Sequence, residues 1–219
     1  MFYIPIFARQ PNLTPPSCLK VYDTQINPEK SRQCKSCKLY LNQFPLSDHQ
    51  QNADVFWVGL SAVQIDDNET RSIPLSPSTR SGKLISDIEN VCDTDITFFK
   101  TNIVKCLPLN GNKIRYPELK EMDKCFPNLE DEIARHKPKL IFLLGRQVAD
   151  FTLKKYGHSL GNLGADFNYN TYKVNDITFV PVHHPSYILV YKRKFIADYV
   201  YEIKNLVENY ICISSCEAL

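Results

Sequence analysis

Four cysteines have the most informative spacing in this sequence of 219 residues. Cys34 and Cys37 form a Cys-x-x-Cys pair, and Cys106 and Cys125 each stand in a Cys-x-Pro context further along the chain. Four thiolates from separate segments can bind either a zinc ion or a [4Fe–4S] cluster, and the spacing does not choose between the two. The alternative is that these cysteines are ordinary small core residues.

Two polar residues follow apolar runs that predict strands. His184, in Val-His-His-Pro-Ser, precedes a helix start that Ser186 could cap, and an imidazole at a helix N-terminus suits a developing anion. Asn102, in Thr-Asn-Ile-Val-Lys-Cys, offers a donor and an acceptor that match the Watson–Crick edge of a pyrimidine. Each residue alone is equally compatible with a structural role.

Basic residues gather in two places. Residues 192–194 read Lys-Arg-Lys, and Arg80 lies with Arg71 and Lys83 around a segment rich in serine and proline. Such clusters can contact phosphate, although surface lysines and arginines commonly contact only water. The net charge of +2 adds little to this choice.

Apolar periodicity predicts alternating strands and helices. The expected strands are 54–59, 97–105, 139–145, 171–174 and 177–182, the last two forming a hairpin. The expected helices are 81–91, 117–136, 146–155 and 195–210. This order favours an α/β fold with a central, mainly parallel four-stranded sheet flanked by helices, in three α/β/α layers.

Functional groups in such a fold gather in loops at the carboxyl ends of the strands. Three segments meet this condition: 60–80, 102–108 and 183–186. The first is long and polar, and loops of that length in compact domains tend to be functional.

The composition is that of a packed protein, with 43% hydrophobic and 23% charged residues. We expect no membrane span, because no stretch approaches 18 consecutive apolar residues. The N-terminus lacks the basic region and the small-residue cleavage site of a secretory signal, so we expect a cytoplasmic protein. Its cysteines should then be reduced rather than paired in disulfides.

Taken together, the motifs resemble family 4 of the uracil-DNA glycosylase superfamily, whose bacterial and archaeal members carry a [4Fe–4S] cluster. The matching motifs, in chain order, are Cys-x-x-Cys, Val-Gly59, Ser-Gly82-Lys-Leu, Thr-Asn102-Ile-Val-Lys-Cys106, Cys125, Leu-Leu-Gly145 and His184-Pro-Ser. The resemblance covers roughly residues 34–205 and is specific as a set. It implies the uracil-DNA glycosylase fold. Residues 1–33 are rich in proline and show little periodicity, so we expect an irregular N-terminal extension at 1–33, a glycosylase domain at 34–211 and a C-terminal tail at 212–219.

The resemblance also assigns roles to individual residues. It implies cluster ligands at Cys34, Cys37, Cys106 and Cys125, with zinc as the alternative metal. It further implies that Asn102 reads the base and that His184 is catalytic.

The sequence departs from the family pattern at its first motif. That motif reads Gly-Glu-Ala-Pro-Gly in the family, whereas residues 59–63 read Gly-Leu-Ser-Ala-Val, so the acid and the Pro-Gly turn are missing. A leucine after the glycine is similar to the related family 5. Ser61 in this segment is a candidate substrate contact.

A second departure lies in the following loop. Pro74-Leu75 stands where the family has a base-stacking phenylalanine after a proline, which makes Leu75 another candidate substrate contact. Asp66 and Asp67 align with an acidic pair that follows the family motif. Asp66 is the candidate carboxylate for orienting water or stabilising the sugar cation, against the alternative of a solvated loop aspartate.

Breaking an N-glycosidic bond leaves an anionic base, and the sequence predicts that His184 stabilises it. The base must first leave the stack, and residues after His-Pro-Ser are candidates to open the duplex. The predicted DNA contacts are Tyr187, Ile188, Lys192, Arg193 and Arg80. The alternative for 187–190 is a buried helical turn.

The departures favour a modified, enlarged cytosine of foreign or phage DNA as the target, in an enzyme that acts as a monomer on double- or single-stranded DNA. Two alternatives stay open. One is conventional uracil removal in base-excision repair, and the other is a catalytically inactive DNA-binding relative.

Overall fold

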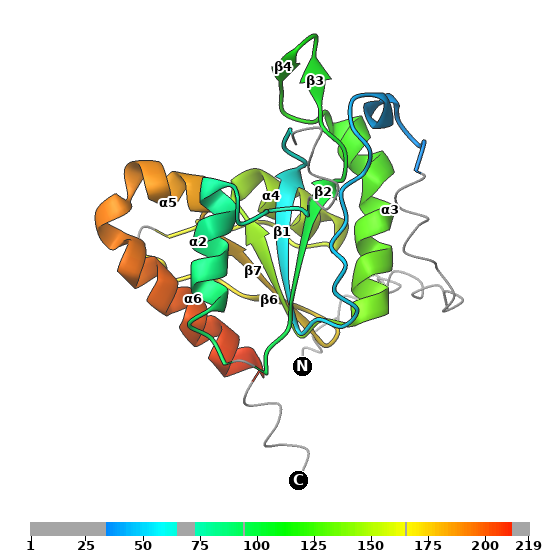
Figure 1. Ribbon diagram of the computed structural model, residues 1–219. Helices are drawn as coiled ribbons and strands as arrows, with labels where there is room; N and C mark the ends of the chain where they lie inside the picture. Colours follow the sequence, from blue (N-terminus) through cyan, green and yellow to red (C-terminus); the bar gives the residue numbers. More distant parts are fainter. Residues whose placement is uncertain (1–33, 65–72, 94, 165, 212–219) are drawn as a thin grey trace, which may run out of the picture.

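The computed structural model describes residues 34–64, 73–93, 95–164 and 166–211 (Figure 1). A five-stranded sheet in the order β2-β1-β5-β7-β6 forms its centre. The strands are β1 (Val55–Ser61), β2 (Phe98–Val104), β5 (Leu140–Leu144), β6 (Tyr172–Val174) and β7 (Ile177–Val182). The first three and β7 run parallel, as predicted, and β6 pairs antiparallel with β7. The predicted count of four strands is therefore corrected to five, because the expected hairpin extends the sheet.

Helices cover both faces of the sheet, which confirms the three-layer architecture (Figure 1). On one face lie α3 (Leu119–His136) and α4 (Arg146–Lys155), and on the other lie α2 (Arg80–Glu89), α5 (Pro185–Tyr191) and α6 (Ile196–Ile211). No helix of the described segments is long and apolar enough to cross a membrane.

The strands sort their side chains between two hydrophobic cores by simple alternation. In β1, Phe56 and Val58 join the core under α3 and α4, whereas Val55 and Trp57 join the core under α2 and α6. All four side chains are fully buried. The continuous apolar run is thus explained by a sheet buried on both sides.

Four short elements complete the fold: η1 (Lys38–Leu41), β3 (Leu109–Asn110), β4 (Lys113–Ile114) and η2 (Arg193–Phe195). Strands β3 and β4 form a small hairpin that projects from the body (Figure 1) and that the apolar pattern did not indicate. The last helix starts almost where expected, but α5 precedes it as a separate helix.

Helix α3 begins with a capping box in which the Glu118 and Glu121 side chains each accept a backbone N–H. His136, in the last turn of α3, packs on Phe56 and Phe99, and burial lowers its pKa to about 4. His136 is therefore neutral near pH 7, and Arg135 alone supplies charge to the last turn.

Candidate active site

An open pocket of about 420 Å³ lies at the carboxyl ends of the parallel strands, where the fold class predicts a site. Its lining comes from the ends of β1, β2 and β5, from the loop before α2, from the start of α4 and from the β7–α5 junction. The lining residues that concern the chemistry are Gly59, Leu60, Ser61, Leu75, Asn102, Tyr116, Gly145, Arg146, Gln147, His184 and Ser186.

Asn102 lies on β2 directly opposite Gly59 of β1. A Cβ at residue 59 would come within 2.3 Å of Asn102 Oδ1, so only glycine leaves room for this amide. The residue is 3% exposed, and its amide makes no hydrogen bond to any other described residue. Since it lines the pocket, its donor and acceptor are available to a ligand.

His184 forms the N-cap of α5 with its own side chain. Its Nδ1 accepts a hydrogen bond from the backbone N–H of Ser186 (3.1 Å) and lies 2.8 Å from Ser186 Oγ. Ser186 was expected to cap this helix, but here it orients the histidine that does so. Because Nδ1 carries the accepting lone pair, the ring proton lies on Nε2.

Burial lowers the pKa of His184, which favours the neutral ring. Gly145 has no side chain, so its backbone can lie close to His184. It has a φ of +89°, and a Cβ there would lie 3.3 Å from the Cβ of His184. A neutral imidazole with an Nε2–H donor is thus fixed at the edge of the pocket.

Leu75 lines the pocket in an unusual backbone conformation, with a φ of +53°. Left-handed backbone is costly for a non-glycine residue, so its surroundings must hold it. The next residue, Ser76, accepts hydrogen bonds at its carbonyl from both the backbone and the hydroxyl of Thr79, which in turn caps α2. Gly82 packs against the carbonyls of Leu75 and Ser76.

Of the remaining predicted site residues, one lines the pocket and one lies outside the described part of the chain. Ser61, the last residue of β1, lines the pocket together with Leu60. Asp66 and its neighbour Asp67 lie outside the described residues.

The lining residues that were not predicted include Tyr116, Arg146 and Gln147. Arg146 and Gln147 follow the end of β5, so the rule that sites gather at strand ends was sufficient to find them. Tyr116 follows the short β3–β4 hairpin, and no sequence signal placed it near the other groups.

The predicted DNA contacts are only partly on the surface. Tyr187 and Arg193 are exposed, Lys192 is half-buried, and Arg80 is exposed beside the pocket residues Thr79 and Ser81. Ile188 is fully buried in the core under α2 and α6, so the prediction that it contacts DNA is wrong. Its side chain points inward because α5 is amphipathic.

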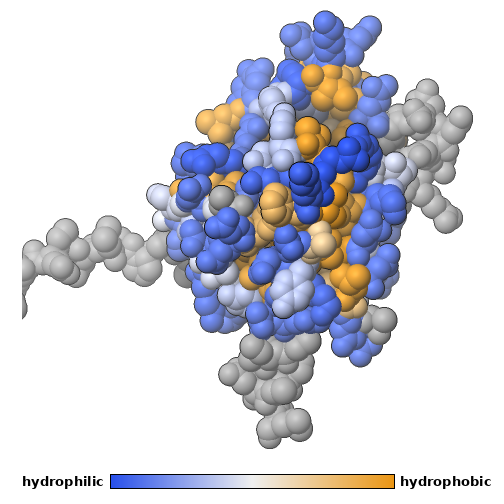
Figure 2. Space-filling view, turned by 90° about the vertical axis from the view of Figure 1, so that its left-hand side faces the viewer, coloured by the Kyte–Doolittle hydropathy of each residue, from blue (hydrophilic) through white to orange (hydrophobic). Residues whose placement is uncertain are grey.

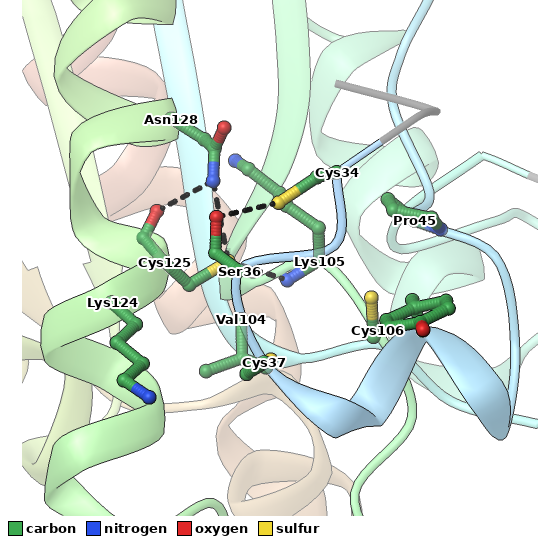
Figure 3. A pocket seen from close by; sticks show the side chains of 11 residues that line it. Cys34, Ser36, Cys37, Pro45, Val104, Lys105, Cys106, Lys124, Cys125 and Asn128 are labelled. Atoms are coloured by element: carbon green, nitrogen blue, oxygen red, sulfur yellow. Dashed lines mark hydrogen bonds between the residues drawn. The ribbon is translucent and has the colours of Figure 1, made fainter. Parts of the chain in front are cut away.

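The four predicted cysteine ligands line a second, smaller pocket (Figure 3). Cys34 and Cys37 precede η1, Cys106 follows β2, and Cys125 lies within α3. Figure 3 shows the four side chains arranged around the same space. Residues that are separated by up to 91 positions in the sequence are thus brought together.

The cysteine pocket is largely buried, and its thiols influence one another. The pKa of Cys106 is raised to about 12, mainly by burial and secondly by the neighbouring thiols. Burial also raises the pKa of Cys125, although its sulfur lies 3.4 Å from the Lys105 N–H and 3.6 Å from Asn128 Nδ2. Within the described ranges, no three or more ligand side chains are arranged to hold a single metal ion.

A buried ion pair adjoins the cysteine pocket, which Lys105 also lines. Lys105 Nζ donates to Glu132 Oε2 (2.6 Å) and to the hydroxyl of Thr101, and that hydroxyl donates to Glu132 Oε2 (2.7 Å). The Lys105 and Glu132 side chains are only 2% and 3% exposed. The pair joins α3 to the strand that carries Asn102, and the sequence gave no indication of it.

The chain is similar to known proteins over most of its length. The Uracil DNA glycosylase superfamily matches residues 38–207, a range that includes Asn102, Cys106, Cys125 and His184. One similar protein is the Type-4 uracil-DNA glycosylase of Sulfurisphaera tokodaii, which is 29% identical over 160 residues, covering 70% of each chain.

Proposed function

Because the chain belongs to the uracil-DNA glycosylase superfamily and is a DNA glycosylase, we propose that it excises a pyrimidine that is flipped into the described pocket. The product is free base and an abasic site. One observation carries this proposal: Asn102 lies on β2 and His184 follows β7, two strands that are separated by β1 and β5, yet both residues line one pocket.

In this mechanism the amide of Asn102 pairs with the edge of the extruded base. The Nε2–H of His184 donates to a base carbonyl oxygen, on which negative charge develops as the N-glycosidic bond breaks. The neutral, oriented imidazole suits this role because it needs no reorganisation during the reaction. Ser61 and Leu75 contact the base from the other walls.

The sugar becomes cation-like and must be attacked by water. None of the described residues that line the pocket is Asp or Glu. We therefore assign Asp66, which follows β1, to orienting this water or stabilising the sugar.

We propose an enlarged cytosine, of the kind found in phage DNA, as the substrate. The pocket volume of about 420 Å³ lies within the range of ligand-binding pockets, roughly 300–1,000 Å³. Leu60 stands where the family has an acid and makes that wall apolar, and Leu75 is smaller than the phenylalanine of the family pattern. Such an enzyme acts in defence against foreign DNA.

Conventional uracil removal is the second candidate, and the name of the Sulfurisphaera tokodaii relative favours it. Duplex and single-stranded oligonucleotides that contain uracil, 5-hydroxymethylcytosine or its glucosylated form distinguish the two. Alkali-labile abasic sites are measured for each. We expect cleavage at a modified cytosine, whereas cleavage at uracil alone would retire the modified-base assignment.

Two pocket variants and one control variant connect this assay to the site. His184→Ala should slow excision by roughly 100- to 1,000-fold, and His158→Ala, outside the pocket, should not. Leu75→Phe should shift selectivity toward unmodified pyrimidines by narrowing the pocket. Wild-type protein that makes no abasic site, but binds DNA as well as His184→Ala does, would instead indicate an inactive DNA-binding relative.

We also propose that Cys34, Cys37, Cys106 and Cys125 hold a [4Fe–4S] cluster. The four side chains line a common pocket, and four cysteine thiolates are the ligand set of such a cluster. Bound there, the cluster would cross-link the segment before η1, the end of β2 and α3, and its role would be structural.

Iron and sulfide analysis of purified protein, together with its visible absorption, tests this assignment. Cys125→Ser should lose iron and stability, whereas Cys92→Ser, at a buried cysteine outside this pocket, should retain iron. Colourless protein with stoichiometric zinc would overturn the cluster.

We further propose DNA as the partner of this enzyme, and we propose that the enzyme is monomeric and cytoplasmic.

A further inference from the structure

A series of aromatic rings runs from the core to the surface beside the active site. Tyr169 is buried and its hydroxyl lies 2.9 Å from Nδ1 of His183. The His183 ring stacks on Tyr187 at 5.2 Å with an interplanar angle of 15°, and Tyr187 lies 5.3 Å from Tyr191. Tyr187 is 39% exposed and Tyr191 is 73% exposed, so the series opens progressively to solvent.

The inner part of the series is firmly held. The backbone carbonyl of His183 accepts a hydrogen bond from the hydroxyl of the fully buried Tyr199 (2.9 Å). Phe167 packs edge-on against both His183 and Tyr199. Tyr187, which stacks on the held His183 ring, is therefore preorganised, and a ligand that stacks on it loses little entropy in ordering it.

The series begins next to the chemistry. His183 immediately precedes His184, and the Tyr187 N–H donates to the His184 carbonyl at 2.9 Å. Figure 2 views the side of the molecule on which α5 and α6 lie, where apolar and hydrophilic patches are interleaved on the surface. A DNA strand that delivers a nucleotide to the pocket must pass close to α5.

Positive charge lies at the end of the same helix. Lys192, Arg193 and Lys194 follow Tyr191 directly, and Lys192 Nζ lies 5.6 Å from the Phe195 ring centroid. Exposed aromatic rings next to cations are the combination that binds single-stranded nucleic acid, with bases on the rings and phosphates on the cations. In a duplex the faces of each base are covered by its neighbours.

We propose that Tyr187 and Tyr191 form a stacking platform for unpaired bases that adjoin the extruded nucleotide, so that the protein prefers single-stranded or locally unpaired DNA to duplex. The inference rests on the proposed glycosylase function only for the path of the strand. The platform itself follows from ring geometry, exposure and charge.

Binding to labelled oligonucleotides without a target base tests the platform. We expect full-length protein to bind a single strand more tightly than its duplex, and Tyr191→Ala to weaken single-strand binding by roughly 5- to 150-fold while duplex binding changes little. Tyr191→Phe should retain affinity. Tyr201→Ala, at a tyrosine on α6 that is 62% exposed, is the matched control. A 2-aminopurine next to the target base should lose fluorescence on binding wild-type protein but not Tyr191→Ala.

Equal binding of wild type and Tyr191→Ala to single strands would overturn the platform. The platform would also be overturned if affinity fell only in Lys192→Gln or Arg193→Gln, and equally for single strands and duplex. That result would indicate phosphate contacts alone. Both results would leave excision by the wild type intact. Failure of the glycosylase assignment is separate, since it shows as an absence of abasic sites whatever the binding.

Discussion

Strand β2 connects two regions that treat polar groups in opposite ways. At the active-site pocket, the Asn102 amide and His184 Nε2 make no hydrogen bond to another described residue, and the pocket is open. Four residues beyond Asn102 lies what we call the closed region, around Cys106, where Lys105 is buried and paired with Oε2 of Glu132, while Oε1 of Glu132 has no partner among the described residues. The difference indicates that β2 holds reactive groups ready at one region and joins chain segments at the other.

The two regions also store energy differently. The pocket contains strained left-handed backbone at Leu75, which the surrounding turn must hold in place. The closed region instead depends on a charge pair whose partners are costly to separate. Changes in the closed region should therefore act on folding, and changes in the open pocket should act on excision.

The largest effect is expected for Lys105→Met. Removing the ammonium leaves Glu132 buried and unpaired, and breaking a buried pair in this way costs about 3–5 kcal/mol. Denaturant unfolding measures the loss of stability. Excision per folded molecule should fall much less, because Lys105 does not line the active-site pocket.

A double variant separates charge from packing in this experiment. Lys105→Met combined with Glu132→Leu replaces the pair by apolar groups and should recover most of the stability. The comparison between the regions fails if Lys105→Met abolishes excision while its unfolding free energy equals that of the wild type.

Gly82→Ala should have an intermediate effect, now on the open pocket. A Cβ at residue 82 would lie 2.0 Å from the Ser76 carbonyl oxygen and 2.3 Å from that of Leu75. The turn that carries Leu75 must move, at a cost of about 1–3 kcal/mol for overpacking. We expect weaker substrate binding in steady-state excision assays, because Leu75 lines the pocket.

Ser86→Ala, in the same helix, is the control for Gly82→Ala because it adds no atom near the turn. Unchanged substrate binding in Gly82→Ala, despite a measurable loss of stability, would show that the position of Leu75 does not matter to the substrate.

Local sequence pattern was sufficient for much of this molecule. The apolar runs located the parallel strands, because a sheet buried on both faces needs continuous hydrophobic segments. The rule about strand ends then placed Asn102 and His184 on the same side of the fold, and the structure brings them to one pocket. The spacing of the cysteines likewise indicated a shared pocket.

Features that depend on contacts between distant segments could not be predicted from the sequence. Lys105 and Glu132 resemble ordinary surface charges in the sequence, and only the packing of α3 on β2 buries them together. The sequence predicts Ile188 as a DNA contact, which is wrong. The buried face of a helix as short as α5 is set by its neighbours α2 and α6, and the sequence of α5 alone does not show it. The β3–β4 hairpin, with two residues in each strand, is too short for periodicity to indicate.

The smallest effect is expected for Ser186→Ala, and it tests how the open pocket orients its histidine. The change removes the hydroxyl that lies 2.8 Å from His184 Nδ1 but keeps the backbone N–H that donates to the same atom. Since one hydrogen bond contributes about 0.5–1.5 kcal/mol, single-turnover excision should slow by roughly 2- to 10-fold. Ser186→Thr keeps the hydroxyl and should restore most of the rate.

A loss in Ser186→Ala as large as that in His184→Ala would mean that the hydroxyl, rather than the backbone, sets the tautomer. The open pocket would then depend on its side-chain network as strongly as the closed region depends on Lys105 and Glu132. A small loss, in contrast, places the orientation of His184 in the helix cap itself, where the backbone of α5 fixes the proton on Nε2 and leaves the side chains of the pocket to select the base.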